Sequence, residues 1–199
     1  VRIMTQLEYA KNRRISLEMQ RVADQEPLGA DEIRENIEAG NTVILKSMLH
    51  DCIPVGIGKG LKIKINANIG TSNYNADPAR ELEKLNMAVK YGADTVMDLS
   101  TGGPIVGIRK EILKQSTIAI GTVPIYQAAV ETVEQGKSVV QMDPDLLFRV
   151  IEQQAEEGVD FITVHCGVTR ESVERLRTQG RIMDVVSRGG AFHLEWILV

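Results

Sequence analysis

Short apolar runs recur along the second two-thirds of the chain, and each one ends in a cluster of polar residues. A run of about four to eight apolar residues bounded by turn residues is typical of a buried strand. The pattern predicts five strands, at residues 61–66, 93–100, 118–123, 161–165 and 183–187.

Helical segments with recognisable start and stop signals separate these runs. Asp77–Pro78 and Asp143–Pro144 each place a capping aspartate before a proline at the first helical position. The two helices that begin there are predicted to end at Gly92 and Gly158, and a third helix is predicted over residues 169–177.

Strands and helices in this order predict parallel βα units, whose strands present their carboxyl ends on one face. We therefore predict an α/β fold of the (β/α)8 TIM-barrel type, with about five βα units in residues 61–199. A closed barrel usually needs roughly 250 residues, so 199 residues suit an incomplete one. The competing architecture, a doubly wound dinucleotide-binding sheet, predicts GxGxxG at the first strand-to-helix turn, where this chain has residues 66–72 without that motif.

Residues 1–60 are predicted to form a helical and loop extension that caps the barrel. The spacing of apolar residues predicts helices up to Gly40, and residues 41–46 are predicted to form a short strand. The glycine-rich segment at residues 55–60 is similar to a phosphate-binding loop, but no strand and helix flank it in the required order. We interpret that segment as a flexible connector.

Composition narrows the class of protein further. The chain is 43% hydrophobic and 25% charged, with a net charge of −4, which is typical of an ordinary globular protein. Without a basic stripe to neutralise phosphates, binding to nucleic acid is not expected. No apolar run reaches the roughly 20 residues that cross a bilayer, so we expect a cytoplasmic protein without a membrane partner.

His165 is the most suggestive single residue for chemistry. It ends an otherwise apolar predicted strand, where a barrel presents catalytic groups, and an imidazole there can bind phosphate or move a proton. His50 and His193 have no such setting. Cys166 follows His165 and should point to the opposite face of the strand, which argues against a Cys/His nucleophilic pair.

Other strand ends carry groups suited to an anion or a sugar. Ser187, Arg188 and Gly189 combine a planar cation with backbone amides that can approach closely, as in a phosphate or carboxylate clamp. Asn68 begins a turn rich in amide and hydroxyl groups, which is equally typical of a turn that only closes a strand. Tyr126 follows a proline that should keep the chain extended, and its phenol could contact a ligand or bond locally.

Met97 lies within an apolar run, so periodicity alone places it in the core. No segment has the spacing of a metal site, because HExxH, CxxC and clustered histidines are all absent from the 199 residues. Cys52 and Cys166 are the only cysteines and form no CxxC pair.

Five of these segments, taken in order, resemble the ThiC family of phosphomethylpyrimidine synthases. The resemblance covers nearly the whole chain and rests on the segments NANIGTS (66–72), GADTVMDLSTG (92–102), IGTVPIYQ (120–127), TVH (163–165) and VSRGG (186–190).

The resemblance implies a site and a reaction. Members of this family are radical S-adenosylmethionine (SAM) enzymes, carbon–carbon lyases of thiamine biosynthesis on a (β/α)8 barrel. They convert 5-aminoimidazole ribonucleotide to 4-amino-5-hydroxymethyl-2-methylpyrimidine phosphate. By the resemblance, the ribonucleotide site is lined by Asn68, Met97, Tyr126, His165, Ser187, Arg188 and Gly189. For Met97 this overrides the core interpretation.

The family pattern also includes segments that these 199 residues do not contain. They are an Asp-Gly-Leu-Arg segment, a glutamate, two histidines that bind a metal, taken as zinc, and the Cys-x-x-Cys-x4-Cys that holds a [4Fe–4S] cluster. With only two cysteines here, we expect no cluster, no SAM cleavage and no activity from these residues alone.

Two alternatives remain at this stage. One is 5-hydroxybenzimidazole synthase, a relative of anaerobic cobamide biosynthesis that uses the same ribonucleotide, and the other is a non-catalytic ribonucleotide-binding paralogue. The resemblance implies a homodimer for the complete enzyme. Five βα units would leave an open sheet edge, so we expect these residues to self-associate when isolated.

Overall fold

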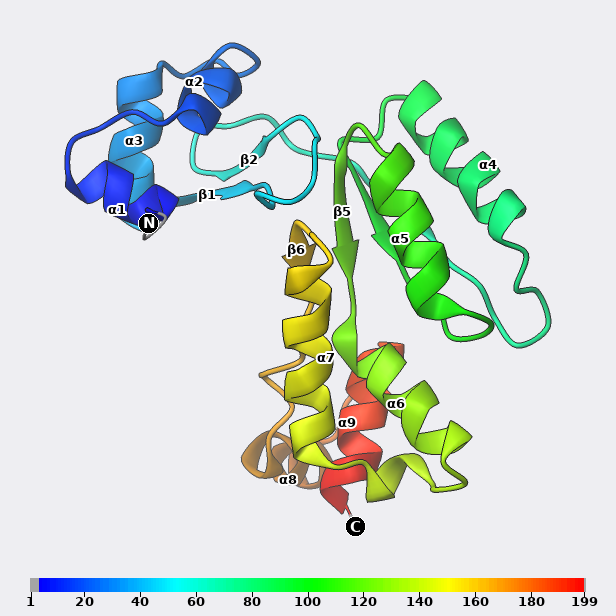
Figure 1. The fold of residues 1–199 in the computed structure, drawn as a ribbon. Helices are drawn as coiled ribbons and strands as arrows, with labels where there is room; N and C mark the ends of the chain where they lie inside the picture. The colour runs from blue at the N-terminus through cyan, green and yellow to red at the C-terminus, as the bar shows by residue number, and fades with distance from the viewer. Residues whose placement is uncertain (1–3, 199) are drawn as a thin grey trace.

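The structure, a computed structural model, describes residues 4–198, and its N-terminal part is a small helical unit with a hairpin (Figure 1). Thr5 and Ser16 cap the first two helices through their side-chain oxygens. Apolar side chains from all three helices form a core that includes Met19, Val22 and Ile33. The elements are α1 (Gln6–Lys11), α2 (Leu17–Ala23), α3 (Ala30–Glu38), β1 (Thr42–Leu45) and β2 (Val55–Gly58).

The glycine-rich segment at residues 55–60 is not the connector that the sequence predicts. Its first four residues form β2, which pairs antiparallel with the predicted strand β1. A Cβ at Gly56 would lie 2.6 Å from a methyl carbon of Val22, so glycine is needed there for the hairpin to pack against α2. The glycines of this segment were an ambiguous signal, because glycine is common both in loops and where two backbones approach closely.

A four-stranded parallel sheet in the order β3-β4-β5-β6 forms the central part of the chain. Each strand follows its neighbour in sequence, with helices between them, as predicted for successive βα units. The strands are β3 (Asn66–Ile69), β4 (Thr95–Asp98), β5 (Ala119–Thr122) and β6 (Phe161–Ile162). The helices are α4 (Pro78–Lys90), α5 (Ile105–Gln115), α6 (Pro124–Glu134), η1 (Val139–Gln141), α7 (Pro144–Glu156), α8 (Arg170–Gln179) and α9 (Arg188–Leu198).

The two faces of this sheet differ. Ile69, Val96 and Ile120 alternate to one face, where they pack with apolar residues of α4 and α5 such as Leu85 and Ile112. The opposite face has no helical layer of that kind among the described residues. It carries Asn68 and Met97 toward the carboxyl ends of the strands, and Ala119, at the start of β5, packs there with residues of the N-terminal hairpin region.

Four sequence predictions about elements need correction. The first strand lies at residues 66–69 rather than 61–66, and β6 ends at Ile162 rather than at residue 165. Residues 183–187 form no strand, because no described strand pairs with them, and their large apolar side chains, such as Met183 and Val186, are exposed. Pro124 does not keep the chain extended; it opens α6, since proline suits the first helical position.

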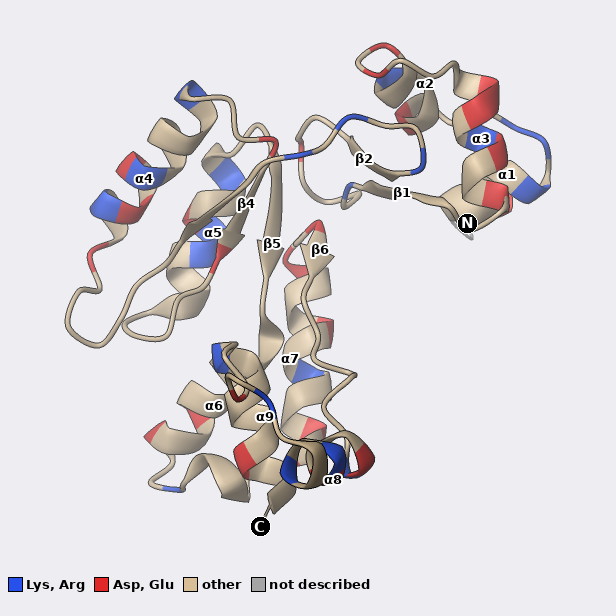
Figure 2. Ribbon diagram, turned by 180° about the vertical axis from the view of Figure 1, so that it is seen from behind, with Lys and Arg blue, Asp and Glu red and all other residues tan. Residues whose placement is uncertain are grey.

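Different elements pack at the two ends of the sheet. The N-terminal elements lie at the end where β5 begins, whereas α6 and α9 gather at the carboxyl end (Figure 1). Lys and Arg alternate with Asp and Glu along α3, α4 and α8, so these surfaces carry both signs of charge (Figure 2). Among the described residues, no helix has the length and apolar character needed to cross a membrane.

Candidate functional site

Asn68 and Met97 lie side by side on the sheet face that carries no helical layer. They are register partners on β3 and β4. The side chain of Asn66 donates a hydrogen bond of 2.8 Å to Asn68 Oδ1, and Asn68 is exposed. Met97 is half-buried, with its Sδ 3.8 Å from Thr163 Oγ1. Met97 also packs against the apolar cluster that contains Tyr126, so it contributes both to the core and to this face.

Arg188 lies over the ring of Tyr126. Its guanidinium carbon is 5.0 Å from the ring centroid, a distance at which a cation is attracted to an aromatic face. The Nη1 atom of Arg188 lies 3.5 Å from Thr101 Oγ1, beyond the end of β4. Tyr126 itself is buried, and Phe192 meets its ring edge-on at 6.0 Å. Arg188 is thus held at the surface by groups from α6 and from the loop after β4.

His165 is fixed by the start of α9. Its Nε2 lies 2.9 Å from Ser187 Oγ, which also accepts a 2.8 Å hydrogen bond from the backbone N–H of Gly190. A Cβ at Gly189 would lie 2.2 Å from Cε1 of the His165 ring. Only glycine leaves room for the imidazole in this position.

The surroundings of His165 favour its neutral form. Burial lowers the pKa of His165, and the charge of His193 lowers it further. The two rings lie 5.5 Å apart, and His193 Nδ1 is 3.0 Å from the carbonyl oxygen of Gly189. His165 Nδ1 is buried without a hydrogen-bond partner among the described residues. An imidazole in this state can accept or donate a proton near neutral pH.

A cavity of about 760 Å³ opens beside Arg188 and Asn68. Its polar wall is made of the turns that follow β3 and β4, and its apolar wall includes Val130 and Val133 of α6 together with Phe192 of α9. This volume lies in the range of small-molecule sites. The cavity can therefore accept a ligand with an anionic group at Arg188 and an apolar part against α6.

Hydrogen bonds join the two turns that form the polar wall of this cavity. Thr71 donates from its backbone N–H to Ser100 Oγ at 3.1 Å and from its hydroxyl to the carbonyl of Gly102 at 2.6 Å. The Ser100 backbone N–H donates to Asp98 Oδ1 at 3.0 Å. Burial raises the pKa of Asp98, although its hydrogen bonds to Ser100 oppose that change. Asp98 therefore supports the cavity wall indirectly, because its hydrogen bond to Ser100 helps to hold both turns together.

The predicted site residues do not all meet in one cavity. Asn68 and Arg188 line the first, whereas His165 and Ser187 line a neighbouring cavity of about 430 Å³ against α8. Tyr126 lies beneath Arg188, with its ring in contact with the guanidinium group. The predicted clamp at residues 187–189 also differs in context, since it begins helix α9 instead of ending a strand.

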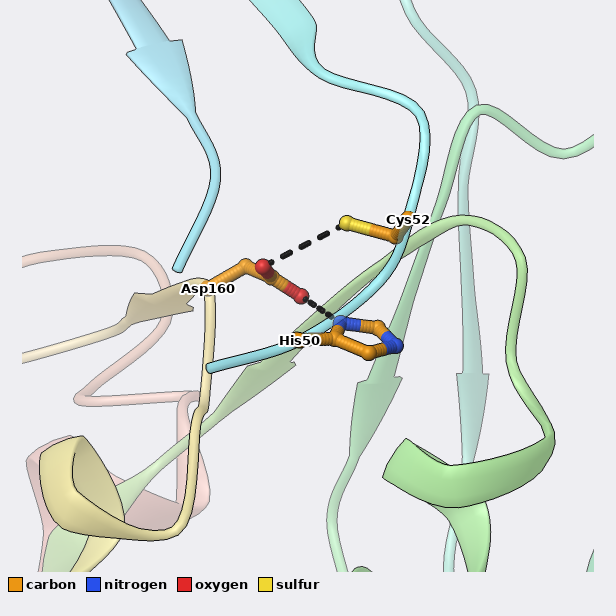
Figure 3. A group of neighbouring side chains, drawn as sticks. All are labelled: His50, Cys52 and Asp160. Carbon is orange, nitrogen blue, oxygen red and sulfur yellow. Dashed lines mark hydrogen bonds and ion pairs between the residues drawn. The ribbon is translucent and has the colours of Figure 1, made fainter. Parts of the chain in front are cut away.

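Sequence reasoning missed several residues that surround the site. Thr101, in the loop after β4, and Phe192 and His193, on α9, contact predicted residues. The periodic signal of α9 was too weak to place Phe192 and His193. The sequence also gave no setting for His50, although His50, Cys52 and Asp160 form a compact group at the opposite end of β5 (Figure 3). Asp160 is distant in sequence, so only the fold could reveal it.

Comparison with known proteins agrees with the resemblance found in the sequence. Residues 5–199 match the description of the radical SAM ThiC family. The chain belongs to this family.

Individual relatives of the ThiC family give the same result. The phosphomethylpyrimidine synthase of Thermodesulfovibrio yellowstonii is 52% identical over 194 residues, which are 98% of this chain and 46% of that protein. The enzyme of the same name from Methanocaldococcus jannaschii is 53% identical over 195 residues, again 98% of this chain and 46% of the relative. The chain therefore spans less than half the length of the curated relatives it matches.

Proposed function

We propose that this chain is the substrate-holding part of a phosphomethylpyrimidine synthase, with 5-aminoimidazole ribonucleotide as the substrate and the pyrimidine phosphate as the product. The observation that carries this proposal is the position of Arg188 between the ring of Tyr126 and Thr101, at a cavity that Asn68 also lines. A permanently charged guanidinium at the start of a helix suits a phosphate.

In this proposal each site residue has a separate task. Arg188 and the backbone at Gly189 receive the phosphate, and Asn68 offers an amide to the ribose or the base. Met97 and Tyr126 supply apolar contact, and neutral His165, oriented by Ser187, exchanges a hydrogen bond or a proton with the ligand. The contacts in the structure support these tasks because they fix each group before a ligand arrives.

We do not assign the cofactors of the family to the residues described here. A [4Fe–4S] cluster needs three neighbouring cysteine ligands in a radical SAM enzyme, and this chain has Cys52, which is buried in the His50–Asp160 group, and Cys166, which is exposed. These residues do not fit a cluster, and we assign no step through it, SAM or zinc. The proposed contribution of this chain is binding and orientation.

The proposed organisation follows the same division. Residues 1–60 form an extension and residues 61–199 a part of a (β/α)8 barrel that further strands would close. We propose a cytoplasmic enzyme that acts as a homodimer, and self-association of these residues when isolated, because the β3 and β6 edges of the sheet have no strand partner among the described residues.

Isothermal titration of the native protein with 5-aminoimidazole ribonucleotide tests the proposal. Arg188→Gln should weaken binding at least tenfold, since a charge-assisted contact to phosphate contributes about 1.5–3 kcal/mol. Arg177→Gln, at an exposed arginine of α8 outside both cavities, is the matched control and should bind as the wild type does. Equal affinity of wild type and Arg188→Gln would refute the phosphate assignment.

Product analysis separates the proposal from its alternatives. Mass spectrometry of an anaerobic reaction of the complete, cluster-loaded protein with the ribonucleotide, SAM and a one-electron reductant should detect the pyrimidine phosphate. Detection of 5-hydroxybenzimidazole would reassign the product while leaving the binding site intact. Tight binding without any product would favour a non-catalytic ribonucleotide-binding protein.

A further inference from the structure

Asp160 is the centre of a buried hydrogen-bond group that lies far from the ribonucleotide cavity. Its side chain is fully buried and immediately precedes β6. One carboxylate oxygen faces His50 Nδ1 at 2.6 Å and accepts the backbone N–H of Ile120 at 2.8 Å. The other accepts the backbone N–H of Ser47 at 2.7 Å and the Cys52 thiol at 3.4 Å (Figure 3).

Both nitrogens of the His50 ring face acceptors. Nδ1 faces the Asp160 carboxylate, and Nε2 lies 3.1 Å from the carbonyl oxygen of Ser116. Neither a carboxylate nor a carbonyl oxygen can donate a hydrogen bond, so both ring nitrogens must carry protons. Burial by itself opposes this charge, but the hydrogen bonds and charges of Asp160 first and of Cys52 second outweigh it and raise the pKa of His50 to about 10.

The same three side chains satisfy the simplest distance test for a metal site, because their ligand atoms lie within 4.8 Å of one another. The detailed geometry favours protons. Two ligands of a tetrahedral zinc ion, each about 2.0–2.1 Å from the metal, lie about 3.3 Å apart. The 2.6 Å between His50 Nδ1 and Asp160 is a hydrogen-bond distance, and each carboxylate oxygen already accepts two bonds.

We propose that His50 and Asp160 form an imidazolium–carboxylate pair, charged at neutral pH, that joins the N-terminal segment to the sheet and positions β6. β6 has two residues, and its pairing with β5 extends on both sides through Asp160 N–H to Ile120 O at 3.0 Å and Thr163 N–H to Thr122 O at 2.8 Å. The pair fixes the start of this short strand. Residues 163–165, which end at His165, follow the strand directly.

The other charged groups near the pair do not compete for its proton. Lys46 donates from Nζ to the backbone carbonyl of His50, and the thiol of Cys52 donates to Asp160. Asp51 is exposed and lies beside a cleft that Cys52 also lines, so it faces solvent instead of the ring. His50 therefore has a single carboxylate partner, and this proposal does not depend on the ribonucleotide assignment.

Nitrogen-15 NMR of the histidine rings in the native protein tests the charge state directly. At pH 8 both His50 nitrogens should show the chemical shifts of a protonated ring, and these shifts should not change between pH 5 and 8. His165 supplies the internal comparison, because it should be neutral at pH 8. His50→Gln identifies the signal. A His50 ring that titrates near pH 6.5 would overturn the proposal.

A double-mutant cycle tests the pairing. His50→Gln and Asp160→Asn should each lower the melting temperature by about 10 °C, because breaking a buried pair leaves one group unsatisfied. The double variant should lose much less than the sum of the two single losses. Additive losses would overturn the proposal, and the NMR test on the wild type stands even where a variant fails to fold.

Zinc titration of the same labelled protein decides between protons and a metal. We expect the His50 signals to remain those of a protonated ring at equimolar zinc. Zinc binding that shifts these signals, and that is lost in both His50→Gln and Cys52→Ser, would replace the proposed ion pair with a metal site.

Discussion

Two histidines at opposite ends of one sheet show how differently the fold treats the same side chain. His50, near the start of β5, has an acceptor at each ring nitrogen, and its side chain is 3% exposed. His165, beyond the end of β6, has a hydroxyl at Nε2 and no partner at Nδ1 among the described residues. The pKa of His50 is raised, and that of His165 is lowered.

The difference agrees with a stabilising role for the His50 end of the sheet and with the ligand binding that we propose at the His165 end. A histidine whose donors are all satisfied, next to a carboxylate, gives up no proton near neutral pH and has no free atom for a ligand. His165 has a lowered pKa and lies beside exposed Ser187 and Arg188, so its ring can exchange a proton near neutral pH. Under the proposed function, stability and ligand binding therefore depend on separate groups, which mutations can separate.

The largest expected effect is on the pH dependence of stability. The pKa of His50 rises from 6.5 to about 10 on folding, so its stabilisation is complete below pH 6.5 and is lost as pH rises through 10. Urea unfolding of the native protein should show stability falling by about 3–5 kcal/mol over that interval. His50→Gln should flatten this part of the curve.

On the acid side of the same curve, stability should fall as the pH is lowered. Burial alone would raise the pKa of Asp160, but the hydrogen bonds from His50 and from backbone N–H groups lower it below 3.8. Its stabilisation is present above pH 3.8 and is lost as pH falls through the lower folded value. A wild-type curve without loss on either side would contradict the charged pair.

The next largest effect concerns the wall of the cavity that we propose for the ribonucleotide. Gly70 has φ +140°, and a Cβ there would lie 2.6 Å from backbone atoms of Leu99 and Ser100. Gly70→Ala should destabilise the protein by about 3 kcal/mol, since neither backbone can move freely. Gly92→Ala is the matched control: its φ is +82° with no atom within 4 Å, so the cost should be about 1 kcal/mol.

Circular dichroism melting curves of the two alanine variants provide the measurement. Ligand binding should be lost in Gly70→Ala, even at temperatures where it is folded, and retained in Gly92→Ala. Equal melting temperatures for the two variants would show that the turns after β3 and β4 can separate without cost.

The repeating βα units could be predicted because their signals are local. The capping pairs at Asp77 and Asp143 begin α4 and α7, and both helices end just before the predicted glycines. Thr169 caps α8 in the same way. Local signals failed where pairing decides the structure: β2 needs β1, and residues 183–187 find no described strand to join.

The candidate site was predictable only in part, for a similar reason. His165 and Arg188 could be proposed from their places beside apolar runs, but their partners Ser187 and Tyr126 are set by how α9 and α6 pack. The pairing of His50 with Asp160 spans 110 residues and has no sequence pattern at all. Contacts of that kind depend on the tertiary fold alone.

A smaller effect is expected at Gly189, where a Cβ would meet the His165 ring at 2.2 Å. The obstacle is the end of a side chain, so Gly189→Ala should cost about 1–3 kcal/mol and displace the imidazole from Ser187. Gly167→Ala, with no atom within 4 Å of its Cβ, is the control. The NMR signals of His165 should change only in Gly189→Ala; unchanged signals would mean that the ring is not held there.

The smallest expected effect concerns the contribution of the His193 charge to the pKa of His165. Burial lowers this pKa first and the charge of His193 lowers it further, so His193→Gln should raise the pKa of His165 toward its ordinary value of 6.5. The glutamine can still donate to the carbonyl of Gly189, which preserves the only hydrogen bond seen for His193. An NMR titration of His165 should therefore shift upward while the melting temperature stays constant. A downward shift would show that His193 supports the protonated form of His165, which would reverse the contrast with His50.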